Sequence, residues 1–153
     1  MRNLNQYLVC HDGIYKTTKN GPEKLGKDFS LWGITHRNVE QRCALDALLD
    51  DKIKLVTLTG KAGTGKTLLA IAAGLEAVIN KRTYKKMIVA RPVIPMGQDL
   101  GYLPGDLNEK LSPWMQQIMD NIEFLFDNQG KKSRNAWADL QNEGLLKMEA
   151  LSY

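Results

Sequence analysis

The chain has 153 residues, 43% of them hydrophobic and 25% charged, and this composition is ordinary for one folded, water-soluble domain. No apolar run approaches the ~20 residues that a membrane span requires, and the N-terminus lacks the apolar segment of a secretory signal. We therefore expect a cytoplasmic protein without a membrane partner. Two cysteines, Cys10 and Cys43, have neither metal-ligand nor disulfide-framework spacing, and the net charge of +4 favours acidic partners only weakly.

Residues 1–28 carry no chemical motif. Two short runs, residues 6–10 and 14–18, flank an Asp-Gly pair at Asp12 and Gly13, a pattern typical of a β-hairpin. The polar stretch that follows contains Gly and Pro and predicts a linker. We assign residues 1–28 to a hairpin and linker that precede the core, and residues 29–153 to the core itself.

The first predicted helix occupies the end of the segment 29–51, with Thr35 or Asn38 as its N-cap. Gln41 lies in its first turn, upstream of the glycine-rich loop described next. A glutamine amide can pair with the N6/N7 edge of adenine. Spacing alone does not separate this role from that of an exposed helix glutamine.

The most informative segment is KLVTLTGKAGTGKTLLAIAAGLEAVIN, residues 54–80. A short apolar run at 55–58 predicts a buried strand, and the apolar face that begins after Lys66 predicts a helix. Between them, GKAGTGKT fits G-x-x-x-x-G-K-[ST] at every fixed position. The nucleotide-binding residues predicted by this P-loop motif are Gly60, Lys61, Ala62, Gly63, Thr64, Gly65, Lys66 and Thr67.

This strand–loop–helix arrangement predicts a nucleoside triphosphate site. The start of a helix leaves amide N–H groups unpaired and carries about half a positive charge, and the glycines let the backbone approach phosphates closely. Lys66 is expected to reach the β- and γ-phosphates, and the Thr67 hydroxyl to ligate Mg²⁺. These two residues are the predicted catalytic contributors, and Thr67 is the predicted metal ligand.

A second buried strand is predicted at 87–90, connected to the first by a right-handed crossover. The basic residues 81–86 precede it, at the edge opposite the phosphate loop, where they complement the helix dipole. Arg91 follows at the carboxyl end of the strand, where open α/β sheets bind ligands, and Pro92 is predicted to end the ladder and begin a long loop through residue 105.

Asp106 and Glu109 form a capping pattern for a long amphipathic helix through residue 126, in which Pro113 introduces a kink or a second helix start. A short helix at 136–143, ended by Gly144, and a strand at 145–151 follow. No apolar strand ending in Asp or Glu follows the phosphate loop, although a P-loop ATPase uses such a residue for Mg²⁺ and the attacking water. We therefore expect the chain to be the front half of a domain.

Three strings, NVEQ at 38–41, TGKAGTGKT at 59–67 and VARPVIPMGQDLGYLPGDLNEKLSPW at 89–114, strongly resemble the PhoH family of bacterial P-loop ATPases. The resemblance implies a RecA-like, three-layer α/β/α fold with a parallel sheet, incomplete at its C-terminus, and a strand ending in Asp-Glu just beyond residue 153. It implies ATP and Mg²⁺ as cofactors, adenine recognition by Gln41, and a helicase-type segment at Arg91 and Pro92 near nucleic acid and the γ-phosphate. Many members carry a preceding PIN ribonuclease domain, whose carboxylate cluster is absent here, although residues 1–28 resemble the connector that follows it.

We thus expect the ATP-binding core of a PhoH-like ATPase that couples hydrolysis to RNA or another single-stranded nucleic acid. Residues 1–153 alone are expected to bind ATP but to hydrolyse it poorly. A P-loop small-molecule kinase and a non-catalytic nucleotide-binding module remain the alternatives. A homo-oligomeric ring is compatible with the sequence, but no residue argues for it.

Overall fold

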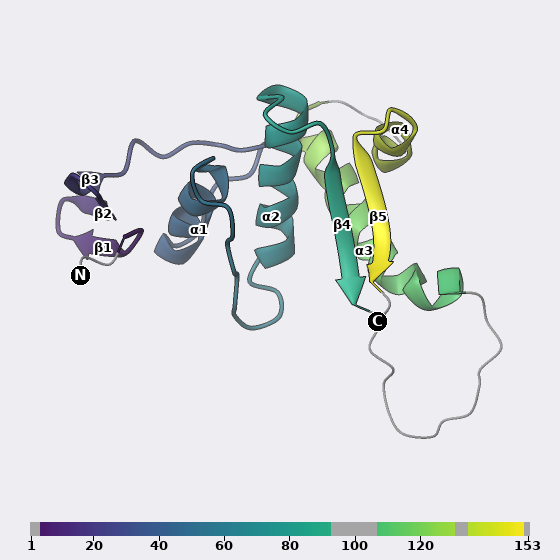
Figure 1. Cartoon of the computed structure of the whole chain (residues 1–153), viewed down its shortest axis with the longest axis horizontal. Coiled ribbons are helices and arrows are strands. Elements are labelled where there is room, and N and C mark those ends of the chain that lie inside the picture. The colour runs from purple at the N-terminus through teal and green to yellow at the C-terminus, as the bar shows by residue number, and fades with distance from the viewer. Residues whose placement is uncertain (1–3, 93–106, 131–134, 152–153) are drawn as a thin grey trace, which may run out of the picture.

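The computed structural model describes residues 4–92, 107–130 and 135–151, with the backbone alone at residues 92, 107–114 and 150. Figure 1 shows the elements in a row, from an N-terminal sheet through α1 and α2 to the strands β4 and β5 with α3 and α4. Their bounds are β1 Tyr7–Cys10, β2 Gly13–Thr18, β3 Gly21–Lys24, α1 Val39–Leu49, α2 Lys66–Leu75, the π-helix η1 Glu76–Asn80, β4 Met87–Pro92, α3 Leu107–Asn128, α4 Ala136–Asn142 and β5 Leu146–Leu151.

The N-terminal segment forms a three-stranded antiparallel sheet in the order β1-β2-β3. The predicted hairpin is present, with Cys10 paired to Gly13 across the turn. The prediction of a linker after it is wrong at residues 21–24, which form β3. The Thr18 hydroxyl donates to the Gly21 carbonyl at 2.8 Å and closes the second turn. Pro22 is accommodated because β3 is an edge strand, where a missing N–H is tolerated.

The hydrophobic core lies between α1, α2 and α3. Asn38 caps α1, as one of the two sequence alternatives predicted, and its Oδ1 accepts from the Gln41 N–H at 2.8 Å. Leu45 of α1, Leu75 of α2 and Leu125 of α3 are fully or almost fully buried in one cluster. Helix α2 continues as η1 to Asn80, so the predicted helix end is confirmed, with a widened last turn.

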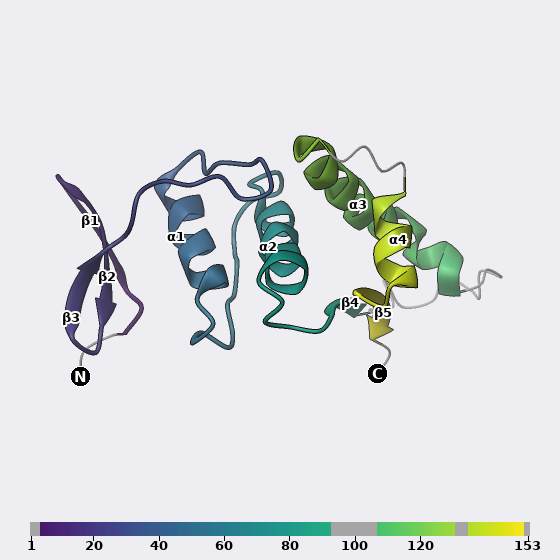
Figure 2. The same cartoon turned by 90° about the horizontal axis from the view of Figure 1, so that it is seen from above.

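Strands β4 and β5 form a two-stranded parallel sheet, with Met87 opposite Leu146 and Pro92 opposite Leu151. Met87 and Val89 pack against the core, whereas Ile88 between them is 51% exposed. The helices lie on one side of this sheet (Figure 2). The fold is therefore α/β with a small parallel sheet, and within the described residues one face of that sheet lacks the helical layer that a three-layer arrangement requires.

The predicted strand before the phosphate loop is wrong for this structure. Residues 53–60 have no regular secondary structure, and Leu55 is 84% exposed. This segment passes between α1 and α2, on the side of α2 away from β4 and β5 (Figures 1 and 2). An extended segment becomes a strand only when a neighbour pairs with its backbone, and none of the described strands pairs with it. The predicted strand–helix–strand crossover is accordingly not formed.

The remaining elements follow the sequence patterns more closely. Helix α3 runs through Pro113 without a break, and Gly144 has a φ of 73° just after α4. Strand β4 extends beyond the predicted residues 87–90, and Pro92 is the last paired residue of the described ladder. The long loop at 93–105 and the cap at Asp106 lie outside the described residues. No helix in the described part of the chain is both long and apolar enough to cross a membrane.

Candidate nucleotide-binding site

The phosphate loop leads directly into the first turn of α2. Gly65 is the N-cap residue with a φ of 84°, and Gly63 has a φ of 77°. These values lie in the left-handed region that glycine adopts at little cost. Leu69 donates its N–H to the Gly65 carbonyl at 2.9 Å. The three preceding N–H groups of the helix therefore point out of its first turn, toward the loop.

The Lys66 ammonium group lies over the loop backbone. Its Nζ is 2.9 Å from the Gly60 carbonyl oxygen, 2.6 Å from that of Lys61, and 3.2 Å from Thr64 Oγ1. The Thr64 hydroxyl itself donates to the Lys61 carbonyl at 2.8 Å. The loop thus curls around one positive charge, next to the open amides of α2. This arrangement concentrates positive potential where a polyphosphate would lie.

The remaining residues of the motif are exposed to solvent. Lys61 and Ala62 are exposed at the outer part of the loop, and Thr67 is exposed in the first turn of α2. Within the described residues, no three His, Cys, Asp or Glu side chains gather into a metal site. A Mg²⁺ ion bound with a triphosphate at this loop would take the Thr67 hydroxyl and phosphate oxygens as ligands, together with water.

Gln41 bridges α1 to the phosphate loop. Its Oε1 accepts from the Arg37 N–H at 2.7 Å, and its Nε2 donates to the Thr64 carbonyl at 3.2 Å. A primary amide has two N–H donors and two oxygen lone pairs. One donor and one lone pair of Gln41 are not used by these two bonds. The amide side chain that the sequence singled out therefore lies at the loop with a donor and an acceptor available.

Arg91 and Pro92 are not brought into the loop. The Arg91 side chain is exposed and makes no hydrogen bond or ion pair with the described residues, while its backbone pairs with β5 opposite Ala150. Strands β4 and β5 nevertheless point toward the same end of the molecule as the start of α2 (Figure 1). The basic segment 81–86 follows η1. It therefore lies at the end of the continuous α2–η1 helix that is opposite the phosphate loop, as predicted.

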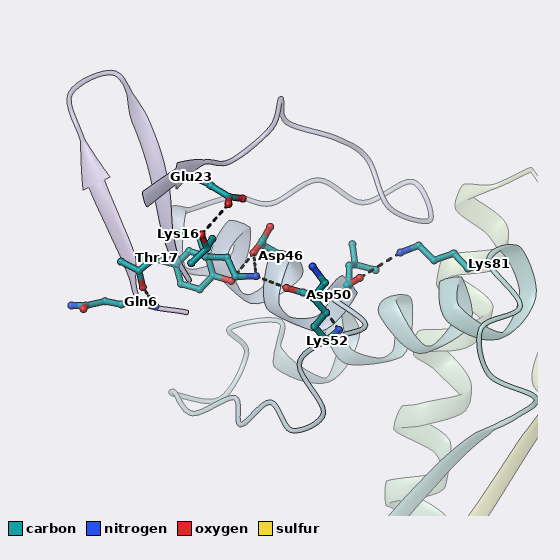
Figure 3. A network of polar contacts seen from close by, with 11 residues as sticks. Gln6, Lys16, Thr17, Glu23, Asp46, Asp50, Lys52 and Lys81 are labelled. Atoms are coloured by element: carbon teal, nitrogen blue, oxygen red, sulfur yellow. Dashed lines mark hydrogen bonds and ion pairs between the residues drawn. The ribbon is translucent and has the colours of Figure 1, made fainter. Parts of the chain in front are cut away.

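The sequence did not reveal a charged cluster that attaches the N-terminal sheet to α1. Lys16 Nζ lies 2.7 Å from Asp50 Oδ2 and 3.1 Å from Asp46 Oδ2, and the Tyr7 hydroxyl donates to Asp46 at 2.7 Å (Figure 3). A cavity of about 810 Å³ opens beside this cluster. The signal available in the sequence was the four-residue spacing of Asp46 and Asp50 on one helical face, but it does not identify the partner lysine.

The cluster changes the protonation of its members. Burial alone lowers the pKa of Lys16, but its hydrogen bonds to Asp50 and Asp46 outweigh this effect and raise the pKa. The hydrogen bond from Lys16 holds the pKa of Asp50 below its usual value. Burial and the bond to Asp46 raise the pKa of Tyr7. The pKa shifts of Lys16 and Asp50 favour the charged forms of their ion pair, and the shift of Tyr7 keeps its hydroxyl protonated as a donor to Asp46. The cluster is therefore an attachment point between the sheet and α1.

Comparison with known proteins extends the family resemblance. The family model described as PhoH-like protein matches residues 33–151. Protein PhoH2 of Bacillus subtilis (strain 168) is 55% identical over 126 residues, which are 82% of this chain and 28% of that protein. Protein PhoH2 of Mycolicibacterium smegmatis is 52% identical over 131 residues, covering 77% of this chain and 30% of that protein. Protein PhoH of Escherichia coli (strain K12) is 40% identical over 87 residues, or 57% of this chain and 24% of that protein. No solved structure matches this chain.

The chain spans less than a third of the length of these relatives. The match at 33–151 includes Gln41, the phosphate loop and Arg91. The similarity to these relatives thus includes the phosphate loop. The chain belongs to the PhoH family.

Proposed function

We propose that this chain binds ATP together with Mg²⁺ at residues 60–67. The observation that carries the proposal is the position of the Lys66 ammonium group, which three loop oxygens hold beside the first-turn amides of α2. A triphosphate replaces these contacts with stronger, charge-assisted ones, because each phosphate oxygen carries negative charge and the loop carbonyls do not.

Two further groups complete the proposed ATP site. The exposed Thr67 would hold a Mg²⁺ ion through its hydroxyl, and the ion would offset the negative charge of the phosphates. The available donor and lone pair of Gln41 pair with N7 and the N6 amino group of adenine, while its other donor and lone pair keep the contacts to Thr64 and Arg37. Gln41 thereby contacts the adenine base and the phosphate loop at the same time.

For a full-length protein that contains this segment, we propose an ATPase that couples hydrolysis to RNA or another single-stranded nucleic acid. The support is family membership and the position of Arg91, whose strand ends at the same end of the molecule as the phosphate loop. Within the described residues, neither β4 nor β5 ends in an acidic residue. We therefore assign to this chain ATP binding with phosphate release close to background, measured as inorganic phosphate over time.

The proposal is tested by thermal unfolding with a non-hydrolysable ATP analogue and Mg²⁺. At a hundredfold excess over Kd, one site adds about 2.7 kcal/mol to the free energy of unfolding, and the melting temperature rises. Lys66→Ala should remove most of the rise. Lys85→Ala, which removes an exposed lysine in the turn before β4, is the matched control and should keep it. The proposal fails if the analogue leaves the melting temperature of the unaltered chain unchanged.

A further inference from the structure

A second cationic pocket lies between the N-terminal sheet and the start of α1. Its volume is about 480 Å³. Three cationic side chains and one carboxylate contribute to its wall, together with an imidazole: Lys24, Lys27, Arg42, Asp28 and His36. We call it the Arg42 pocket. It shares none of these side chains with the phosphate loop.

Arg42 is held rigidly in this wall and is incompletely paired. It is 4% exposed, its guanidinium carbon lies 5.0 Å from the centre of the Phe29 ring, and its Nη2 donates to the Gly26 carbonyl at 3.1 Å. Its Nη1 is buried and has no hydrogen-bond partner, and His36 Nδ1 is in the same condition. A buried donor without an acceptor is costly, and more so when the donor is charged.

The carboxylate nearest to Arg42 compensates its charge poorly. Asp28 Oδ1 lies 3.6 Å from Arg42 Nε and 3.5 Å from His36 Nε2, both longer than an ordinary hydrogen bond. The Asp28 side chain is 77% exposed. Water therefore screens its attraction, and the carboxylate is free to rotate outward. An anion with more charge and more oxygens would satisfy the same two side chains better.

We propose that the Arg42 pocket binds a phosphate group between Arg42 and His36, in place of the Asp28 carboxylate. A phosphate monoester or free phosphate carries about −1.5 to −2 charges near neutral pH. Lys24 already pairs with Asp12 at 3.1 Å, so the charge of the phosphate would be offset mainly by Arg42 and Lys27. The phosphate oxygens would face Arg42 Nε and His36 Nε2, the two atoms that now lie nearest to Asp28, and Lys27, exposed at the rim, adds attraction. The phosphate is either a free ion or a backbone phosphate of a nucleic acid strand. This site is additional to the proposed ATP site.

The test is a titration followed by assigned amide NMR signals, in a Lys66→Ala background so that the phosphate loop contributes little. The probes are inorganic phosphate and, separately, a short single-stranded oligouridylate. Saturable shifts at His36 and Arg42 are expected with at least one probe. Shifts with phosphate alone identify a free ion as the ligand, whereas oligouridylate that competes with phosphate identifies a backbone phosphate. If neither probe moves these signals, the proposal is wrong.

Asp28→Asn gives the sharper result, because the competing charge is removed. Phosphate affinity should rise about threefold or more, whereas a carboxylate that only supports Arg42 would give unchanged or weaker binding and refute the proposal. Asp127→Asn, at an exposed carboxylate near the end of α3, controls for net charge and should leave the affinity unaltered. His36→Gln should weaken binding, and it serves as the second variant because it leaves the buried guanidinium in place.

Discussion

Replacing Gln41 with alanine separates the two roles of this side chain. The substitution removes two bonds to the backbone, one to the Arg37 N–H at 2.7 Å and one to the Thr64 carbonyl at 3.2 Å. Each such bond contributes about 0.5–1.5 kcal/mol, and partial exposure places them toward the lower value. A lost bidentate contact to adenine costs about 1–3 kcal/mol more. Loss of the two backbone bonds should reduce the affinity for any polyphosphate, whereas loss of the adenine contact should reduce the affinity for ATP alone.

Isothermal titration of the variant with an ATP analogue and with tripolyphosphate, each with Mg²⁺, measures both losses. We expect affinity for the analogue to fall about tenfold or more, and affinity for tripolyphosphate to fall distinctly less. Gln116→Ala, at an exposed glutamine of α3 that pairs with Asp120, should change neither. An equal fall in affinity for the two ligands would refute adenine recognition by Gln41. Its role would then be limited to the contact with the phosphate loop.

Three further substitutions test the packing around the site. Leu45→Ala, at a fully buried position of α1, should lower the free energy of unfolding in urea by about 2–5 kcal/mol. Lys16→Met removes the cation that pairs with Asp46 and Asp50. It should cost about 1–3 kcal/mol, below the value for a fully buried pair because the carboxylates are 24% and 27% exposed. Since the pKa of Asp50 is lowered in the folded chain, its contribution is present above its unfolded pKa of about 3.9 and is lost as pH falls through the folded pKa. When the free energy of unfolding is measured against pH, Lys16→Met should lose less stability on acidification than the unaltered chain. Gly65→Ala forces a left-handed φ on alanine at about 1–2 kcal/mol, and it should weaken binding of the ATP analogue measured by calorimetry.

Local sequence patterns predicted the turn at the phosphate loop well. Gly63 and Gly65 adopt left-handed backbone angles, and Asn38 caps α1, because both features depend on residues within one turn of the chain. The strand β5 was also predicted, since its residues have the required apolar pattern and follow a glycine that ends α4. What binds at these residues remains a prediction.

The failures of the sequence reasoning concern the partner with which a segment pairs. The apolar run at 55–58 has the composition of a strand, but Leu55 is exposed because no described strand lies beside it. Residues 21–24 contain Gly and Pro and still form β3, because β2 supplies a neighbour. Composition measures the preference of a segment, whereas a strand also requires a partner that composition does not name.

The charged sites illustrate the same limit for side chains. Lys16 contacts Asp50 across 34 positions in sequence. Arg42 contacts Gly26, in the segment predicted as a linker, and Phe29, at the start of the predicted core. A lysine or an arginine in isolation is most often a solvated surface residue. Only the packing of the N-terminal sheet against α1 distinguishes these two residues from the other basic residues of the chain.

The most direct measurement of the central claim is an amide NMR titration of the unaltered chain with a non-hydrolysable ATP analogue and Mg²⁺. We predict saturable shifts of the backbone signals of Gly63, Gly65, Lys66 and Thr67, because their N–H groups would surround the phosphates. The same titration of Lys66→Ala should show little saturation. If these signals stay in place while the analogue binds elsewhere, or if nothing binds, the phosphate loop is not the nucleotide site and the account is contradicted.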